Sequence, residues 1–457
     1  MGTLELTEQL AGVVTTDLVG TIVRTVGMTA AVADFPAPIG AVVEIERQTG
    51  EPLPAEVIGF RDQLTLLYLL KEMSGIRHGN RVRLVRTTRW LRVGPQLLGR
   101  MVDAHGQCID NRPEPALADR IPLDRAAPRA IDRPRIDEPL STGIRAIDGL
   151  LTCGKGQRMG IFAGSGVGKS VALGMMCRYT AADVNVIALI GERGREVNEF
   201  IERDLGPDGI AKSVVVVATN DEPALARVHA ASTATAIAEY FRDQGKDVLL
   251  VMDSLTRLAL AQREIGLAAG EPPTTRGFTP SVFTLLPRIL ERAGRSRTGS
   301  ITGFYSVLVE GDDPNEPICD AVRGLLDGHT WLSRRIAARG HYPAIDVLDS
   351  ISRLMTEVAS QEHRAAAQAV REVLAAYREH EDLISIGAYR RGSNRVVDVA
   401  IDLQGELNHF LRQAIEEGSS VESSKGALVE LHRRIEALKQ APQRATVPAA
   451  AQEERRA

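Results

Sequence analysis

The sequence has little cysteine and no recognisable metal-binding pattern. Its four cysteines lie far apart and form no C-x-x-C pair, so we expect reduced thiols in a cytoplasmic protein rather than disulfides or metal ligands. The nine histidines show no H-E-x-x-H or comparable spacing, and this argues against a histidine metal site. These cysteines are Cys108, Cys153, Cys177 and Cys319.

Long apolar runs and a strong excess of one charge are also missing. No apolar stretch approaches the length that spans a bilayer, and the N-terminus lacks a signal-peptide core, so we expect the protein to act at a membrane only from outside it. The net charge is −4 and the isoelectric point is near 6.2. These values give no global electrostatic reason to bind nucleic acid, and we expect no nucleic-acid partner.

What is present is an ordinary globular composition over 457 residues, with 44% hydrophobic and 25% charged residues. This length predicts about three domains. Short β-rich runs separated by turns fill residues 18–92 and predict a small closed barrel. Aromatic residues are few there, which favours an assembly collar over an oligonucleotide-binding module. These aromatics are Phe35, Phe60, Tyr68 and Trp90.

The rest of the chain shows two further patterns of apolar and polar residues. Residues 93–355 alternate apolar strands with helices and predict a mostly parallel sheet with helices on both faces. Residues 271–300 within it look rich in loops. From 356 to 440 the pattern is helical, and Ser419–Glu422 predicts a capping box. We expect residues 1–17 to form a short N-terminal segment and 441–457 a disordered tail.

A glycine-rich stretch between a buried strand and a helix dominates the middle of the chain. Gly164, Gly166 and Gly168 allow successive N–H groups to point at phosphate oxygens, and the helix that starts at Lys169 adds the positive end of its dipole. Lys169 supplies a mobile positive charge, and Ser170 a hydroxyl ligand for Mg²⁺. Ala163 replaces the first glycine of G-x-x-x-x-G-K-[ST], a small departure. The predicted nucleotide-binding residues of this loop are Gly164, Ser165, Gly166, Val167, Gly168, Lys169, Ser170 and Val171.

Two later strands end in carboxylates. The strand 247–253 ends at Asp253, which predicts a ligand to the water shell of Mg²⁺ at the sheet edge where ligands bind. The strand 184–190 is followed by Glu192, which can polarise a water in line with the γ-phosphate of ATP. The alternative is that Glu192 only caps the next helix or pairs with Arg195.

Four ordered motifs resemble those of the rotary ATPase catalytic subunits, and within that superfamily the flagellar and type III secretion export ATPases. The resemblance covers roughly residues 18 to 440. The motifs are Gly164-Ser-Gly-Val-Gly-Lys-Ser170, Gly191-Glu-Arg-Gly-Arg-Glu-Val197, Val248-Leu-Leu-Val-Met-Asp-Ser-Leu-Thr-Arg257 and His341-Tyr-Pro-Ala-Ile-Asp-Val-Leu-Asp-Ser-Ile-Ser-Arg353.

The resemblance implies an α/β fold in which a RecA-like P-loop domain is flanked by an N-terminal β-barrel and a C-terminal helical domain, with six subunits in a ring. It implies that Arg193 and Arg257 lie near the phosphates and that Tyr342 packs on adenine. It also implies that Arg353 is an arginine finger for the ATP of the neighbouring subunit. An isolated subunit would then lack one charge that stabilises the transition state.

Partners and location also follow only from the resemblance. It implies a cytoplasmic enzyme, peripheral to the inner-membrane export apparatus. The implied partners are a regulatory stator protein, a coiled-coil central stalk, the export gate and chaperone–cargo complexes. Only about 17 residues precede the predicted barrel, fewer than the flagellar members suggest, and this puts stator docking at that end in doubt.

Three rival interpretations stay open. The β subunit of ATP synthase has Thr-Arg-Glu-Gly where this chain has Gly194-Arg-Glu-Val197, and an acidic C-terminal run that is missing here. Non-catalytic ring subunits carry glutamine in place of Glu192. A hexameric RNA helicase of the termination-factor type conflicts with the acidic balance. Between flagellar and virulence export, the residues around Leu383–Tyr389 favour the flagellar enzyme.

Overall fold

The computed structural model describes residues 17–71, 74–309, 311 and 313–441. They form two compact units. The first comprises residues through 135, 155–165 and 182–326, and the second comprises 136–154, 166–181 and the chain from 327 onward. The predictions for residues 1–16 and 442–457 lie outside the described residues.

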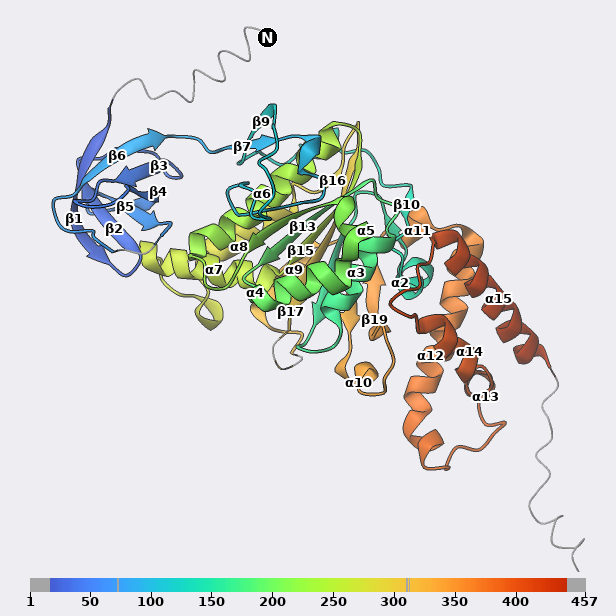
Figure 1. Ribbon diagram of the computed structural model, residues 1–457. Helices are drawn as coiled ribbons and strands as arrows, with labels where there is room; N and C mark the ends of the chain where they lie inside the picture. The colour runs from blue at the N-terminus through green and yellow to red at the C-terminus, as the bar shows by residue number, and fades with distance from the viewer. Residues whose placement is uncertain (1–16, 72–73, 310, 312, 442–457) are drawn as a thin grey trace, which may run out of the picture. The chain divides into compact units, whose positions relative to one another are not determined.

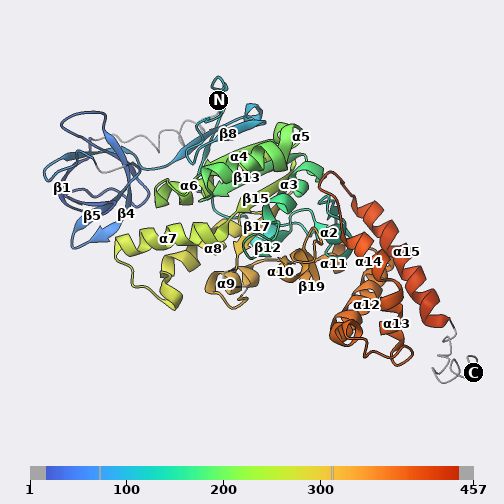
Figure 2. The ribbon, with the colours of Figure 1, turned by 60° about the horizontal axis from the view of Figure 1, so that its bottom comes forward.

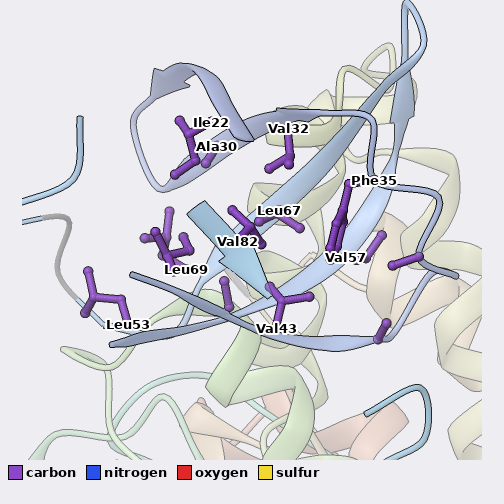
Figure 3. Close-up of a cluster of buried hydrophobic side chains, with 14 residues drawn as sticks. Ile22, Ala30, Val32, Phe35, Val43, Leu53, Val57, Leu67, Leu69 and Val82 are labelled. Atoms are coloured by element: carbon purple, nitrogen blue, oxygen red, sulfur yellow. The ribbon is translucent and has the colours of Figure 1, made fainter. Parts of the chain in front are cut away.

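Six antiparallel strands at the start of the first unit close into a barrel in the order β1-β2-β5-β4-β3-β6, because β1 pairs with both β2 and β6. Figure 3 shows their apolar side chains pointing toward one another inside it. Ile22 lies opposite Val32, and Leu67 lies opposite Val57. These side chains are fully buried, so the barrel is a packed core. The strands are β1 (Val19–Val26), β2 (Thr29–Ala33), β3 (Val42–Ile45), β4 (Leu53–Arg61), β5 (Leu64–Leu69) and β6 (Arg81–Arg86).

A parallel sheet forms the centre of the first unit, with strands in the order β12-β17-β15-β13-β14-β8. Its middle strands β13 and β14 are mostly apolar and buried at every residue, as expected for strands covered on both faces. The predicted strands 184–190, 213–218 and 247–253 are confirmed residue by residue. The strands of this sheet are β8 (Arg100–Val102), β12 (Arg158–Ala163), β13 (Val184–Ile190), β14 (Ser213–Ala218), β15 (Asp247–Asp253) and β17 (Ser300–Leu308); β16 (Gly294–Arg295) pairs antiparallel with β17, and β7 (Trp90–Val93) pairs with β9 (Asp119–Pro122).

Helix α6 lies along β13, β14 and β15, while α7 packs against β17 and α8 (Figures 1 and 2). The prediction that 271–300 is rich in loops is wrong for its centre, which forms helix α8. Pro280 fits the first turn, where its missing N–H costs nothing, and Val282, Leu286 and Ile289 recur at helical spacing and are buried. The helices of this unit are α4 (Gly194–Glu199), continued by a π-helical turn at Phe200–Leu205, α5 (Gly206–Ala211), α6 (Ala224–Asp243), α7 (Leu255–Ala269), α8 (Pro280–Leu290) and α9 (Pro317–Leu325).

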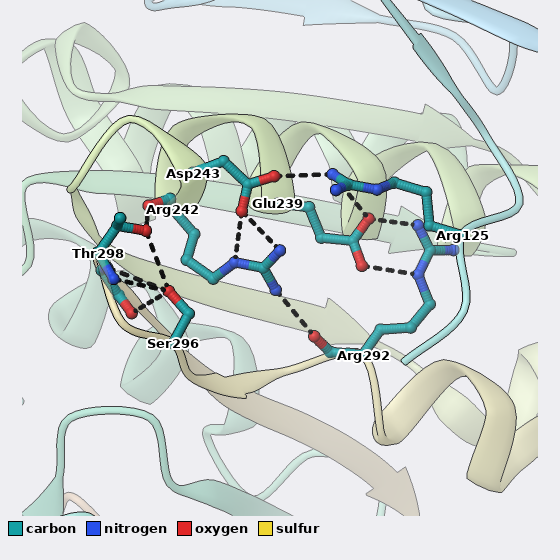
Figure 4. A network of polar contacts seen from close by, with 8 residues as sticks. Arg125, Glu239, Arg242, Asp243, Arg292, Ser296 and Thr298 are labelled. Carbon is teal, nitrogen blue, oxygen red and sulfur yellow. Dashed lines mark hydrogen bonds and ion pairs between the residues drawn. The ribbon is translucent and has the colours of Figure 1, made fainter. Parts of the chain in front are cut away.

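A buried ion pair fixes the segment after α8 to α6 (Figure 4). Arg292 donates two hydrogen bonds, of 3.0 and 2.8 Å, to the two carboxylate oxygens of Glu239. Both side chains are 2% exposed. Arg125 lies 3.9 Å from the same carboxylate and pairs more closely with Asp243, at 2.8 Å.

Removing one partner of this pair should be strongly destabilising. Glu239→Gln leaves the Arg292 guanidinium buried without a carboxylate, at a cost of about 3–5 kcal/mol. Asp320→Asn on α9 is the control, because Asp320 and its partner Arg323 are 70% and 35% exposed, and losing this surface pair should cost less than about 1 kcal/mol. Thermal unfolding of the two variants checks this order. Equal melting temperatures would contradict it.

The second unit combines short strands with a helical C-terminal part. Strand β18 pairs antiparallel with β19, and α12, α13, α14 and α15 pack together (Figures 1 and 2). The α/β fold with an N-terminal barrel and a C-terminal helical region is thus confirmed. The elements are β10 (Pro139–Leu140), α2 (Arg145–Leu150), β11 (Cys153–Gly154), α3 (Lys169–Tyr179), β18 (Gly328–Leu332), α10 (Arg334–Ala337), β19 (Ile345–Ser352), α11 (Met355–Val358), α12 (Gln361–Ser385), α13 (Arg395–Asp402), α14 (Gln404–Leu411) and α15 (Val421–Gln440).

The capping box of the last helix differs from the predicted one by one residue. Ser420, not Ser419, is the N-cap of α15, and it exchanges hydrogen bonds with Ser423 rather than Glu422. Serine can do this because its hydroxyl both accepts and donates. Ser419 instead contacts Ser423 and Ser424 through its hydroxyl.

Candidate functional site

The candidate site of the first unit lies at one edge of its parallel sheet. Strands β12, β15 and β13 run parallel, so their carboxyl ends share an edge. Gly164 follows the end of β12, Asp253 ends β15, and Glu192 is the second residue after β13. Ligands of open α/β sheets bind at this edge. The fold therefore brings the start of the glycine-rich loop and both predicted carboxylates to the same edge.

Asp253 is held in one orientation. Its side chain is buried, and its Oδ1 accepts a 2.6 Å hydrogen bond from the hydroxyl of Ser306 on the adjacent strand β17. No group of three histidine, cysteine or acidic side chains that could hold a metal occurs among the described residues. A Mg²⁺ ion at Asp253 would therefore take most of its oxygen ligands from phosphate and water, as Mg²⁺ commonly does.

Glu192 pairs with Arg257. Its Oε1 lies 3.2 Å from Nε of Arg257, and the Glu192 side chain is only 14% exposed. Gly191 makes this approach possible: its φ is +68°, and a Cβ there would lie 2.9 Å from Cδ of Arg257. Arg195, the alternative partner that the sequence predicted for Glu192, pairs with Glu199 at 3.2 Å.

Glu196 lies beside this pair, in the first turn of α4. A hydrogen bond with the Glu192 carboxyl lowers the pKa of Glu196, and the positive charges of Arg193 and Arg257 lower it further. Arg193 is 72% exposed and pairs with Glu196 at 3.3 Å. Two carboxyls and two guanidiniums thus form one cluster at the end of β13.

The glycine-rich loop continues into the second unit. Gly166 and Gly168 have φ values of +76° and +90°, a conformation that glycine adopts without a steric penalty. Gly168 is the N-cap of α3 and offers no side chain to cap it. The first N–H groups of an eleven-residue helix are therefore available to an anion, so this loop fits the phosphates of a nucleotide.

Tyr342 and Arg353 also lie in the second unit. Two atoms of the Tyr342 ring lie 3.5 Å from the position that a Cβ on Gly168 would occupy, and the ring is 47% exposed. Tyr342 is thus an exposed aromatic surface beside the phosphate loop. Arg353 follows the last residue of β19 and is exposed; its backbone N–H donates to the carbonyl of Asp327 at 3.0 Å.

Comparison with known proteins identifies the family. The flagellum-specific ATP synthase of Bacillus subtilis is 50% identical over 414 residues, which is 91% of this chain and 93% of that protein. The chain belongs to the flagellar and type III secretion ATPase family. The type 3 secretion system ATPase of Xanthomonas euvesicatoria is 51% identical over 406 residues, which is 89% of this chain and 92% of that protein. This secretion ATPase is therefore similar to a flagellar and to a type 3 secretion member of the family at nearly the same identity.

Family models and solved structures agree with this assignment. Residues 143–352 match the ATP synthase alpha/beta family, nucleotide-binding domain, and 359–430 match the T3SS EscN ATPase C-terminal domain. The assembled ATPase EscN from the enteropathogenic E. coli type III secretion system superposes with a TM-score of 0.86 and 46% identity, over 90% of this chain and 99% of EscN. The match to a type III secretion C-terminal domain favours this family over the β subunit of ATP synthase, and the chain is an ATPase.

Two contacts in the site of this secretion ATPase were not predicted from the sequence. Ser306 orients Asp253, and Glu196 shares a hydrogen bond with Glu192. Glu192 lies two residues before α4 begins, whereas Glu196 lies within α4, so helical spacing does not predict their contact. The position of Ser306 in a mostly apolar strand gives no indication either, because its partner comes from a different strand.

Proposed function

We propose that this secretion ATPase hydrolyses Mg-ATP at a site made of the phosphate-binding loop, Glu192 and Asp253, and that the hydrolysis serves protein export. The observation that carries the proposal is Glu192, a nearly buried carboxylate paired with Arg257 at the ligand-binding edge of the sheet. A subunit that only bound nucleotide would need no such carboxylate there.

The loop residues bind the phosphates. The N–H groups of the loop from Gly164 to Val171 surround the phosphate oxygens, and Lys169 neutralises the outer phosphates. The Ser170 hydroxyl and, through water, Asp253 would hold Mg²⁺. When it is bound, Mg²⁺ offsets the charge that develops on the leaving phosphates. Ser306 keeps the Asp253 carboxylate oriented toward this role.

Glu192 acts on the attacking water. Its carboxylate accepts a hydrogen bond from that water and orients it in line with the γ-phosphate of ATP, while Arg257 keeps the carboxylate in place. Arg193, which is exposed in the isolated chain, and Arg257 lie near the phosphates. The exposed ring of Tyr342 stacks on adenine.

Arg353 completes the site of a neighbouring subunit. We propose a homohexamer in which each Arg353 reaches the γ-phosphate of the ATP held by the next subunit in the ring. Its exposure at the end of β19 supports this, because an arginine finger must extend from its own subunit. EscN, which this chain resembles, has been solved both as an assembled ATPase and in complex with its central stalk EscO.

The proposed partners are a coiled-coil central stalk, a regulatory stator protein, chaperone–cargo complexes and the export gate. We place the enzyme in the cytoplasm, peripheral to the inner membrane. Among the described residues, no helix is long and apolar enough to cross a bilayer. The proposed domain division is 18–92, 93–355 and 356–440. We favour flagellar cargo; the similarly close virulence relative makes a virulence substrate the second candidate.

The test is the rate of ATP hydrolysis per subunit at increasing protein concentration. A finger supplied by a neighbour makes the specific rate climb as rings assemble, by orders of magnitude where the isolated subunit is compared with the ring. Phosphate release measured alongside the oligomeric state checks this. A specific rate that stays flat while the protein passes from monomer to ring would contradict the proposal.

A further inference from the structure

The strand that carries Arg353 contains a bulge just before its end. Along the β18–β19 pair, Trp331 lies opposite Asp346, whereas His329 lies opposite Ile351. One residue of β18 therefore faces the four residues 347–350 of β19. We call residues 346–350 the β19 bulge. Bulges re-aim the residues that follow them, and Arg353 follows this one by three positions.

The β19 bulge has a defined shape. The Asp346 carboxylate accepts hydrogen bonds from the N–H groups of Leu348 and Asp349, at 3.1 and 3.3 Å. The Ser350 hydroxyl donates to the Asp346 carbonyl at 2.5 Å and accepts from the Trp331 N–H at 2.8 Å. These bonds fix the bulge internally and join it to β18, but they do not attach it to the C-terminal helices.

Two arginines of α12 make that attachment. Arg371 donates to the Val347 carbonyl at 2.6 Å and, from its other terminal nitrogen, to the Leu150 carbonyl at 3.0 Å. Arg378, two turns later on the same helix, pairs with Asp346 at 3.1 Å and with Asp349 at 3.0 Å. One face of α12 thus contacts the β19 bulge at both its backbone and its carboxylates.

The chemistry of Arg371 is unusual for a structural contact. Every acceptor recorded for its guanidinium is a backbone carbonyl, and burial lowers its pKa. A cavity of about 550 Å³, lined by Leu348, Ile351, Ala367 and Arg371, lies beside the strand. On that side, hydrogen bonds from the rigid, forked guanidinium of Arg371 bridge the bulge and α12.

We propose that Arg371, assisted by Arg378, is a positioning residue that holds the β19 bulge so that Arg353 reaches the neighbouring subunit's ATP. The inference rests on the proposed finger role of Arg353. It assigns α12 of the C-terminal helical region a direct mechanical connection to hydrolysis. A shift of α12 moves the bulge, and a misplacement of about 1 Å can cost a rate factor near 10².

The test uses full-length Arg371→Gln, Arg371→Lys and Arg378→Gln, with Arg364→Gln as the matched control. Arg364 lies seven residues before Arg371 on α12 and is exposed. We expect Arg371→Gln to lower kcat about 10- to 100-fold with KM for ATP and ring assembly unchanged. Arg371→Lys should fail to restore kcat, because an ammonium lacks the fork. Arg364→Gln should behave as wild type.

Mixed rings separate positioning from a general structural role. Arg371→Gln subunits mixed with Glu192→Gln subunits should regain activity, because a Glu192→Gln subunit supplies a correctly held Arg353 to its neighbour. Equal mixing creates intact sites at about a quarter of the positions. If Arg371→Gln does not fold, as judged by thermal unfolding, Arg378→Gln takes its place in the mixture.

A mixture of Arg353→Ala with Glu192→Gln subunits distinguishes a failure of the positioning role of Arg371 from a failure of the proposed finger role of Arg353. If that mixture recovers activity and the Arg371→Gln mixture does not, Arg371 is not a positioning residue and the finger stands. If neither mixture recovers activity, Arg353 does not act on the ATP of a neighbouring subunit, and both proposals are overturned. Loss of ring assembly or a raised KM in Arg371→Gln would also overturn the positioning role.

Discussion

Glu192→Gln should abolish hydrolysis while leaving ATP binding intact. The amide keeps the size of the side chain and can still reach the water, but it is a far weaker acceptor of the proton that the water loses. Removing such a general base costs about 10²–10⁴-fold in rate. The phosphate-binding loop does not involve Glu192, so nucleotide affinity should change little.

The measurement is single-turnover phosphate release, with affinity taken from a fluorescent ATP analogue. Glu199→Gln is the matched control, since Glu199 lies seven residues later and pairs with the exposed Arg195. It should retain the wild-type rate. A Glu192→Gln enzyme that kept more than a tenth of the wild-type rate would show that another group activates the water.

Arg353→Ala should lose nearly all activity and recover it in mixed rings. Where arginine fingers act, they contribute about 10³–10⁵ to kcat, because they neutralise charge that appears only in the transition state. Alone, Arg353→Ala rings lack every finger, and Glu192→Gln rings lack every base. In mixtures, a site with Glu192 can stand next to a subunit with Arg353.

Activity plotted against the mixing ratio makes this quantitative. The rate should be near zero at both ends and highest at equal amounts, at about a quarter of the wild-type rate for independent sites in a ring of head-to-tail contacts. A flat line at the level of the inactive variants would mean that Arg353 acts on ATP in its own subunit. Pre-formed rings that cannot exchange subunits serve as the control.

The fold could be predicted where local pattern and tertiary structure agree. The strands 184–190, 213–218 and 247–253 are buried almost throughout, so their mostly apolar runs were sufficient to place them. The prediction for residues 271–300 was wrong because the prolines and arginines of this segment are typical of loops, although its centre is a helix. Pro280 starts α8 instead of breaking it, and Pro287 lies inside it.

The site could be predicted at residues whose chemistry is local in sequence. The glycines of the phosphate loop and the carboxylate that ends β15 follow from spacing alone. The contact between Glu192 and Arg257 could not be predicted from the sequence, because it joins residues from two different elements that approach each other next to Gly191, which has no side chain. The hydrogen bonds from Arg371 to the Val347 and Leu150 carbonyls could not be predicted either, since every residue carries a backbone carbonyl and the sequence does not show which one is used.

The closure of the N-terminal barrel limits how copies of this chain can associate. Each of its strands has hydrogen-bonded neighbours on both sides, so the barrel presents no row of free backbone donors and acceptors. Barrels crowded side by side therefore cannot join into a continuous sheet, the route by which exposed strand edges lead to aggregation. Any contact between two barrels must therefore be made by side chains. Substituting these side chains can strengthen or weaken the contact, or reverse its charge, while the barrel stays folded.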